Sequence, residues 1–319
     1  MRPMTLPDGE GFHTDVNELS ALAVCTSAGR EHLIGVGDEA ADLFVLEPRD
    51  CSIVMQARLA TSYTAPEHGS NFEGVAADNF GRVVIVTESP AGLVMLAKES
   101  FHESRVVSHW RVLFDEASVR AIAGVKPEDP LHPEGVLLLR DGHVLVVHEK
   151  DPPGLLEFGP PGDLPLGIHP GSYLPANEAF TARPPKLEAR AWWPTPVPPD
   201  DPPPDPPAHA PDPMDDRVLK DVSDLAVWKG RLHLLSDQST CIARLASEDV
   251  EPGTTIEFDA VWNLPAGLKK PEGLAFTADG HVYVGLDIKL AEQPNALNLF
   301  RFPPLVNQGG DGANTVQRA

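Results

Sequence analysis

The chain has 319 residues, of which 42% are hydrophobic and 23% are charged, a composition typical of a globular protein with a substantial core. Its 47 acidic residues outnumber 25 basic ones and give a formal net charge of −22 at pH 7. A surface of that sign repels nucleic-acid phosphates and anionic lipids, so we expect neither nucleic acid nor a membrane as a partner. No signal-peptide pattern and no run of roughly 20 apolar residues is present, which favours a cytoplasmic location.

Short apolar strands recur along the chain in a constant order. An acidic residue opens a first strand, a turn and a second strand ending in an acid follow, and a third strand comes next. The second strands are rich in β-branched or aliphatic residues and include 82–87, 143–148, 232–236 and 282–286. A more polar fourth strand is expected at 51–59, 105–113 and 255–262. Helical patterns are confined to 115–125 and 176–183.

Four antiparallel strands per repeat are typical of a β-propeller blade. The units begin at residues 18, 73, 134, 224 and 272. The sequence therefore predicts an all-β protein, a single five-bladed β-propeller of four-stranded antiparallel blades over residues 1–319. Six blades, one of them degenerate, is the alternative. Residues 1–6 are expected to close the ring by adding a strand beside Phe300.

The widest gap between units holds an insertion at residues 160–216. Its stretch 194–213 is rich in proline and aspartate, a composition that cannot build a packed sheet and therefore predicts a disordered segment. The insertion is interpreted either as an inert linker or as an arm that docks a protein partner. Residues 186–193 are expected to form the outer strand of the third blade, and the tail 305–319 is expected to be flexible.

The three cysteines match no zinc-binding spacing and are expected to be buried, reduced thiols (Cys25, Cys51 and Cys241). The chain has no nucleophile elbow, phosphate-binding loop or dinucleotide fingerprint. Nucleotide cofactors are therefore not expected.

Each unit contains a pair of acidic residues, one before or in the first strand and one after the second. In the second, third and fifth units the two acids stand 15 residues apart about a turn. Residues equidistant from a hairpin turn lie opposite each other, so two carboxylates are expected side by side in each unit. The pairs are Glu18 with Asp38, Glu73 with Glu88, Glu134 with Glu149, Asp224 with Asp237, and Glu272 with Asp287.

First strands line the central tunnel of a propeller, so all ten acids are expected at one mouth of it. Like charges about 5 Å apart repel by roughly 3 kcal/mol at an effective dielectric near 20, which protonation or a cation would offset. Oxygen ligands favour a hard cation, and Ca²⁺ is predicted, with Mg²⁺ as the alternative. A structural interpretation also stays open, in which the acids bond to backbone amides of the next blade. The predicted metal ligands are Glu18, Glu73, Glu134, Asp224, Glu272, Asp38, Asp237 and Asp287.

Residues next to the acids are candidates for catalysis and substrate binding. Glu149 and Glu88 are candidates to activate water, and His148 is a candidate general acid or base because its ordinary pKa lies near neutrality. His148 alternates with Glu149 along its strand and can instead point into the blade. Cationic side chains near the mouth are predicted either to bind an anionic substrate or to relieve the negative field: Lys150, Lys289, Lys270 and His132.

The order of acid, glycine, aliphatic residue, turn, apolar strand and acid recurs at 71–88, 132–149 and 270–287. It resembles the SdiA-regulated-like and phytase-like bacterial β-propellers over most of the chain outside the proline-rich insertion. The resemblance implies a propeller fold. It implies an activity less specifically, because those propellers include calcium-dependent esterases, lactonases and phosphatases as well as members without an assigned reaction.

These observations together predict a metal-dependent hydrolase, with calcium as the expected metal. Its substrate would be a small anionic ester, lactone or phosphoester at the acidic mouth. Two alternatives stay open. One is a non-catalytic propeller that binds a ligand or a protein and holds a structural metal, and the other is an intracellular isomerase or cyclase that uses the same mouth.

Overall fold

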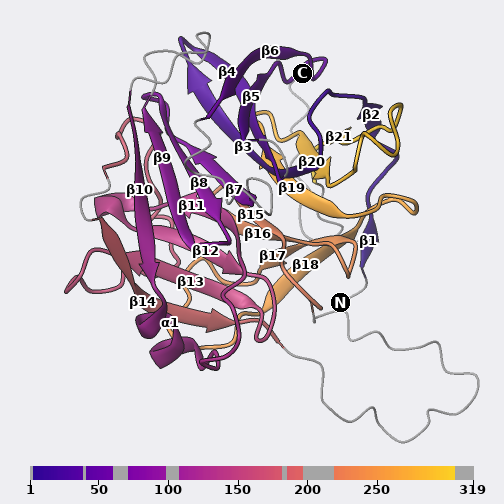
Figure 1. Ribbon diagram of the computed structural model, residues 1–319. Helices are drawn as coiled ribbons and strands as arrows, with labels where there is room; N and C mark the ends of the chain where they lie inside the picture. The colour runs from indigo at the N-terminus through magenta and orange to yellow at the C-terminus, as the bar shows by residue number, and fades with distance from the viewer. Residues whose placement is uncertain are drawn as a thin grey trace, which may run out of the picture.

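The computed structural model describes residues 3–38, 41–59, 71–97, 108–181, 185–196 and 219–305. Strands dominate these residues, which contain one α-helix, α1 (Glu116–Ala123), and one short 3₁₀ turn at Arg140–Gly142. The strands form four sheets arranged around a common centre (Figure 1). The predicted all-β class is therefore confirmed.

Two of the sheets have four antiparallel strands each. The first follows chain order and contains β3 (Leu19–Ser27), β4 (Arg30–Gly37), β5 (Asp42–Leu46) and β6 (Ile53–Arg58). The second joins the two ends of the chain and contains β19 (Pro271–Phe276), β20 (Val282–Leu286), β21 (Leu299–Phe302) and β2 (Glu10–Phe12).

A third sheet has five strands and a fourth has eight. The five-stranded sheet contains β15 (Asp224–Trp228), β16 (Arg231–Ser236), β17 (Cys241–Leu245), β18 (Phe258–Asn263) and β1 (Met4–Thr5), the last parallel to β18. The eight-stranded sheet contains β7 (Phe72–Ala77), β8 (Arg82–Thr87), β9 (Gly92–Ala97), β10 (Ser108–Asp115), β11 (Pro133–Leu138), β12 (Val144–His148), β13 (Gly154–Gly159) and β14 (Lys186–Pro194). Its two antiparallel halves meet through a parallel pairing of β10 with β14.

Five first strands lie at the centre of the molecule. Each contacts the next in the cyclic order β3, β7, β11, β15 and β19, and β19 returns to β3. The later strands of each set lie farther from this centre, as the labels in Figure 1 show. This radial arrangement of antiparallel strands around a common axis is that of a β-propeller.

The hydrophobic core is divided into clusters that lie between neighbouring sets of strands. In one cluster Ile34 and Val36 of β4 pack with Ile85 of β8. In another, Leu235 of β16 packs with Val284 of β20. Both faces of the middle strands are therefore covered, which explains why these strands are nearly continuous apolar runs in the sequence.

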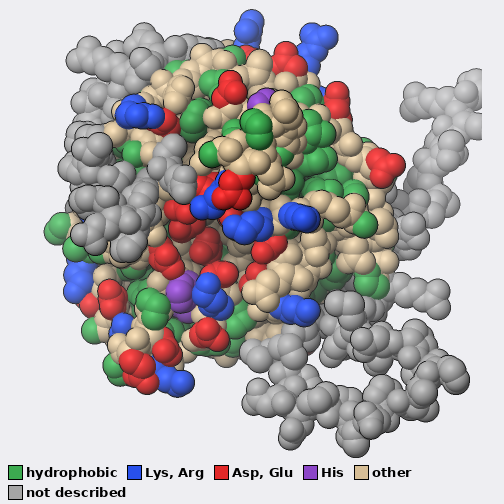
Figure 2. Space-filling model, turned by 45° about the vertical axis from the view of Figure 1, so that its right-hand side comes forward, with side chains coloured by type: hydrophobic (Ala, Val, Ile, Leu, Met, Phe, Trp, Pro, Cys, Tyr) green, Lys and Arg blue, Asp and Glu red, His purple; other side chains and the backbone are tan. Residues whose placement is uncertain are grey.

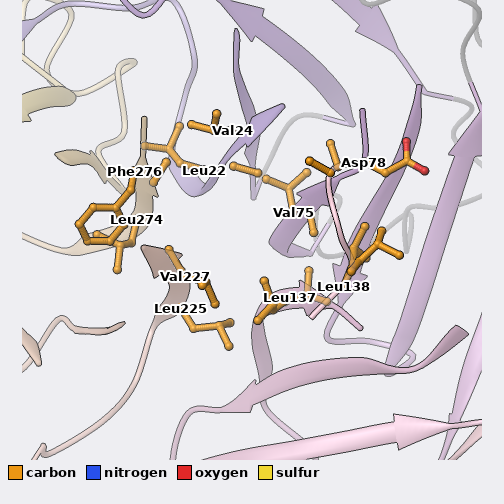
Figure 3. A pocket seen from close by; sticks show the side chains of 18 of the residues that line it. Leu22, Val24, Val75, Asp78, Leu137, Leu138, Leu225, Val227, Leu274 and Phe276 are labelled. Carbon is orange, nitrogen blue, oxygen red and sulfur yellow. The ribbon is translucent and has the colours of Figure 1, made fainter. Parts of the chain in front are cut away.

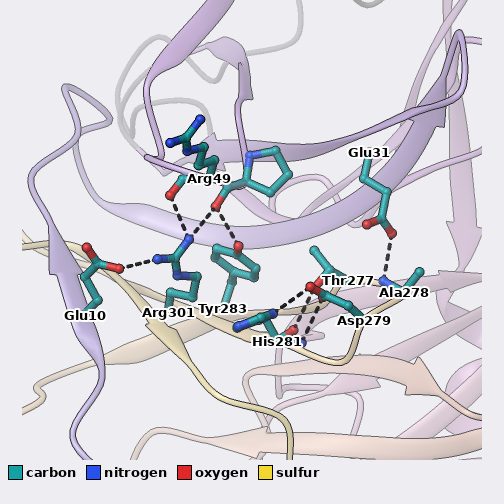
Figure 4. Close-up of polar contacts among 10 residues, drawn as sticks. Glu10, Glu31, Arg49, Thr277, Ala278, Asp279, His281, Tyr283 and Arg301 are labelled. Carbon is teal, nitrogen blue, oxygen red and sulfur yellow. Dashed lines mark hydrogen bonds and ion pairs between the residues drawn. The ribbon is translucent and has the colours of Figure 1, made fainter.

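The N-terminal segment closes the ring with a different strand from the one predicted. Residues 10–12 form β2 and pair with β21, whereas Met4 and Thr5 pair with β18 of the preceding sheet. Arg301 of β21 forms an ion pair with Glu10 and donates to the backbone oxygen of Arg49 at 2.7 Å (Figure 4). The Tyr283 hydroxyl donates to the oxygen of Pro48 at 2.6 Å, so the last sheet is also bonded to the first.

The described residues test several further predictions made from the sequence. The predicted outer strand at 186–193 is confirmed as β14, and the helical pattern at 115–125 is confirmed as α1. The second helical pattern is wrong for its described residues, because 176–178 form a turn and a bend and 179–181 have no regular secondary structure. The three cysteines are free and buried, as expected. Most of the proline-rich stretch 194–213 and of the tail 305–319 lies outside the described residues. Within those residues, no helix has the length and apolar character needed to cross a bilayer.

Glycines in the first strands allow neighbouring strands to approach closely. A Cβ atom at Gly74 of β7 would lie 2.4 Å from the backbone oxygen of Glu134 in β11, a contact that side-chain rotation cannot relieve. We therefore predict that Gly74→Ala lowers the free energy of unfolding by about 1–3 kcal/mol, as overpacking does in well-packed cores. Urea unfolding measures this loss. The matched control is Gly35→Ala, whose Cβ would meet the flexible end of Leu19 at 3.0 Å and would lie 3.7 Å from the backbone oxygen of Ala21, an ordinary contact. An equal loss in both variants would contradict the prediction.

Candidate functional site

Three glutamates lie in β-bulges at the start of first strands. The pairing with the second strand shifts by one residue between Phe72 and Gly74, and equivalent shifts occur in β11 and β19. Each bulge includes the acid of its unit, Glu73, Glu134 or Glu272. The expected side-by-side pairing of the two acids across the hairpin is therefore wrong. Instead, the backbone N–H of each second acid bonds to the residue two positions before the first, and Glu88 N donates to Asn71 O at 3.2 Å.

The same hydrogen bond gives the alignment of the first unit. Asp38 N donates to Glu18 O at 3.1 Å, which makes Glu18 the equivalent of Asn71 and not of Glu73. The shift in β3 lies between Leu19 and Ala21, so Ser20 occupies the bulge. The prediction of an inner acid at the equivalent position of this unit is therefore wrong.

The fourth unit also departs from the predicted alignment. Asp224 pairs with Leu235 as Gly74 pairs with Val86, so Asp224 stands at the glycine position and Ser223 precedes it. Of the five equivalent positions, three carry glutamate and two carry serine. Aligning the units on the apolar residue before the bulge, rather than on the acid, would have revealed this from the sequence. Those apolar residues are Leu19, Phe72, Pro133, Val222 and Pro271.

Asp224 lies across the axis of the tunnel and joins three first strands. Its side chain is buried, and its oxygens accept hydrogen bonds from Leu225 N at 2.8 Å and Leu274 N at 2.6 Å. The backbone amide of Leu22 also bonds to it. Burial raises the pKa of Asp224 well above its ordinary value, and the three amide hydrogen bonds act in the opposite direction. A carboxyl group so bonded fits the structural interpretation of a buried acid.

Glu73, Glu134 and Glu272 form a cluster of carboxyl groups on the mouth side of Asp224. Burial is the main cause that raises the pKa of Glu73 to about 8 and that of Glu272 to about 9. Burial also raises the pKa of Glu134 well above its ordinary value, and the charges of Glu73 and Glu149 add to the effect. The three side chains also influence each other's pKa, because the negative charge of each carboxylate disfavours ionisation of the next. Protons therefore remain on this cluster at neutral pH.

Basic side chains at the mouth are paired with the outer acids. Figure 2 shows Asp and Glu side chains gathered in a hollow with Lys and Arg beside them. Lys270 forms an ion pair with Asp287, and the other pairs are Lys289 Nζ with Glu18 at 3.1 Å, Lys150 Nζ with Glu149 at 2.5 Å and His132 Nδ1 with Glu88 at 2.6 Å. All four cations named from the sequence therefore lie at this mouth and contact acids. This geometry corresponds to the interpretation that they relieve the negative field.

Two further acids of the site belong to the fourth unit. Burial, and next the charge of Asp221, raises the pKa of Asp237. Asp221 was not among the sequence candidates, although it lies in the position of Asn71. It accepts a hydrogen bond from the Ser236 hydroxyl at 2.5 Å and bonds to Gln238 N at 3.2 Å, so it fixes the turn that carries Asp237.

His148 is buried inside the blade, and its ring lies edge-on to that of His132 with the two centroids 6.3 Å apart. Its side chain is 1% exposed, and Nδ1 bonds to the backbone oxygen of Pro152 at 2.9 Å. Its ring also packs edge-on against Trp192. Burial lowers the pKa of His148 to about 4, which keeps the imidazole neutral at physiological pH.

The carboxylate oxygens at the mouth are of the type that binds hard cations, but they are not arranged as the ligands of one ion. Among the described residues, no three His, Cys, Asp or Glu side chains are grouped as ligands of one metal ion. Calcium takes six to eight oxygen ligands, whereas Asp287 and Glu149 are already paired with Lys270 and Lys150. The residues as placed therefore do not fit a calcium ion.

A cavity of about 580 Å³ opens beside His132, the partner of Glu88 at the mouth. Backbone and side chains from two loops line it, including Lys126, Asp129 and Asp151. This volume falls in the range of small-molecule sites. None of the inner glutamates lines this cavity, and His132 is the residue that connects it to Glu88.

Comparison with solved structures supports the fold. No protein-family model and no curated protein matches the chain. The glutaminyl cyclase of Myxococcus xanthus is 12% identical and similar over 94% of this chain and 97% of its own, with a TM-score of 0.50. A putative oxidoreductase (glucose dehydrogenase) of Thermus thermophilus is 14% identical over 92% and 98% of the two chains, also with a TM-score of 0.50. Such identities show a shared β-propeller fold and no particular activity.

Titration of the carboxyl cluster makes stability depend on pH. Glu73 and Glu272 bind protons in the folded protein up to pH values of about 8 and 9, whereas the unfolded chain releases them near its ordinary glutamate pKa. Between these values the folded state holds more protons, so stability falls as pH rises. We predict that the free energy of unfolding decreases from pH 6.5 to 8.5, by at least about 1 kcal/mol given ~1.4 kcal/mol per pKa unit.

Urea unfolding at several pH values provides the test. Glu272→Gln removes one titrating group, so its stability should fall less steeply over the same interval. The exposed Glu251→Gln is the matched control and should follow the wild type. A Glu272→Gln profile parallel to the wild type would contradict the assignment.

Proposed function

We propose that the protein is an enzyme that acts on a small molecule at the acidic mouth, with Glu73, Glu134 and Glu272 as proton-transfer groups. The observation that carries the proposal is the position of these three glutamates in bulges at the same end of the central first strands, where burial raises the pKa of each. Perturbed titration of several groups at one site is typical of acid–base catalysis. Carboxyl groups that only held strands together would not need to share protons while they remain partly accessible to solvent.

The reaction that this arrangement serves best is attack of a nucleophile on an acyl carbon. A protonated glutamic acid can donate to the carbonyl oxygen or to the leaving group, and a neighbouring carboxylate can accept the proton of the nucleophile. With water as nucleophile the reaction is hydrolysis of a small ester or lactone, as the sequence predicts. With an amine of the substrate itself the reaction is a cyclisation, the alternative already considered.

The local negative field favours a substrate that brings a positive or hydrogen-bond-donating group. This differs from the anionic substrate expected from the sequence, because Lys150, Lys270, Lys289 and His132 contact acids. Two structural neighbours of similar length are a glutaminyl cyclase and a putative oxidoreductase (glucose dehydrogenase). They guide the choice of test substrates and carry no argument for the reaction.

Two structural expectations belong to the same proposal. We take the five central strands as the first strands of five blades, with the eight-stranded sheet divided at the parallel contact of β10 with β14. The resemblance to SdiA-regulated-like and phytase-like propellers also remains a proposal. The regular antiparallel sets of four strands support both.

Substitution of the inner glutamates tests the catalytic role. Purified protein is assayed against small esters, lactones, phosphoesters and peptides with an N-terminal glutamine. We predict that Glu134→Gln and Glu272→Gln each lower kcat/KM about 10²–10⁴-fold, the usual contribution of a positioned acid or base. Glu251→Gln is the control. Turnover in both glutamine variants close to that of the wild type would contradict the proposal.

Calcium is tested separately, and no step of the proposed reaction depends on it. Several acids with raised pKa values would release protons to a divalent cation, so binding should strengthen as pH rises. If calcium binds at the mouth, 1 mM CaCl₂ raises the Tm of chelator-treated protein more at pH 8.5 than at pH 6, and Glu134→Gln removes the shift. The absence of any shift, with turnover maintained in a chelator, would overturn the metal-dependent hydrolase and leave the acid–base proposal intact.

A further inference from the structure

The central tunnel contains a cavity of about 360 Å³ on the other side of Asp224 from the carboxyl cluster. All five first strands contribute to its wall, and Figure 3 shows their side chains around a shared space. The wall is mainly aliphatic. Its residues include Leu22, Val75, Leu137, Leu225, Val227 and Leu274.

The cavity and the acidic mouth are separate compartments. Along β11, Leu137 lies three residues after Glu134, which corresponds to roughly 10 Å at about 3.3 Å per residue. Between them, the strands approach so closely that a Cβ at Gly135 would lie 2.3 Å from Asp224 Oδ1. The buried carboxyl group and the glycine backbones therefore fill the tunnel at this level.

The polar groups at the edge of the cavity already have hydrogen-bond partners. Asp78 Oδ1 accepts from Phe80 N at 2.8 Å and from Arg82 N at 2.9 Å, and its Oδ2 accepts from Phe180 N at 2.8 Å. Asn79 accepts from Thr26 N and donates to the oxygen of Ala176. Both side chains are therefore held by hydrogen bonds within the protein, and the aliphatic side chains of the five first strands supply most of the remaining contacts.

We propose that this cavity binds one small, uncharged, apolar molecule, independently of the acidic mouth. Its volume lies within the range of small-molecule sites. An α-helix with side chains is about 10–12 Å wide, too wide to enter a space enclosed by five first strands. Aliphatic side chains from all five first strands line the cavity, so an apolar molecule that displaces water from them gains contact with each strand.

Fluorescence titration with the neutral probe N-phenyl-1-naphthylamine tests the proposal. We expect saturable enhancement with the wild type and at least a tenfold weaker Kd with Leu137→Phe, because the larger ring occupies the cavity. Leu164→Phe is the matched control, since Leu164 is 83% exposed and lies outside the cavity. Val227→Phe places the same obstruction on another strand if the first variant does not fold, and circular dichroism checks the fold of each.

The titration has outcomes that overturn the proposal. No saturable binding by the wild type would do so, as would equal affinity in the wild type and a folded cavity-filling variant. Glu134→Gln should bind the probe as the wild type does, because the two compartments are separated. If that variant weakened binding as much as Leu137→Phe, the probe would lie at the acidic mouth and the assignment of the cavity would fail.

Discussion

The hydrogen bonds of one buried carboxyl group hold the centre of the molecule together. Asp224 accepts from backbone amides of β15, β19 and β3, so a single side chain joins three of the five strands that surround the axis. Buried amides without partners would destabilise the fold, and an unbonded buried carboxyl group would do the same. The side chain also fills space that neighbouring glycines leave open. The Asp224 side chain closes the tunnel at this level. It therefore sets where the acidic cluster ends and where the apolar cavity begins.

The mouth shows how a propeller can gather charges that repel each other. Bulges turn Glu73, Glu134 and Glu272 out of regular pairing at the start of their strands, and burial with mutual repulsion raises the pKa of each. The ion pairs of Lys150, Lys270 and Lys289 with acids lower the net charge at the mouth, and Glu88 bonds to His132. Protons inside and cations outside together reduce the repulsion. The same arrangement supplies acids and carboxylates within one site, which is what acyl-carbon chemistry requires.

The two ends of the tunnel differ in polarity because the Asp224 side chain lies between them. On one side the first strands present carboxyl groups, and on the other they present Val and Leu side chains over three or four further residues. A short distance along each strand therefore separates a polar site from an apolar one. If both sites bind molecules, a single scaffold holds two ligands of opposite chemistry without contact between them.

The repeated alternation of apolar strands and turns was enough to predict the all-β class and the positions of strands such as β14. These features depend on local periodicity and on residues a few positions apart.

The register was not predictable, because a bulge adds one residue without any change in composition. The bulge in β3 leaves Glu18 outside the group of inner glutamates. The register of β15 places Asp224 at the position that glycine occupies in β7, β11 and β19. Ring closure by β2 rather than by residues 1–6, and the pairing of the lysines with acids, depend on contacts between distant segments. Local patterns in the sequence were sufficient for the strands and for the three units that carry Glu73, Glu134 and Glu272. The three-dimensional contacts were needed to show which acids share protons and which one closes the tunnel, because both depend on spacings of a few ångströms between strands from different repeats.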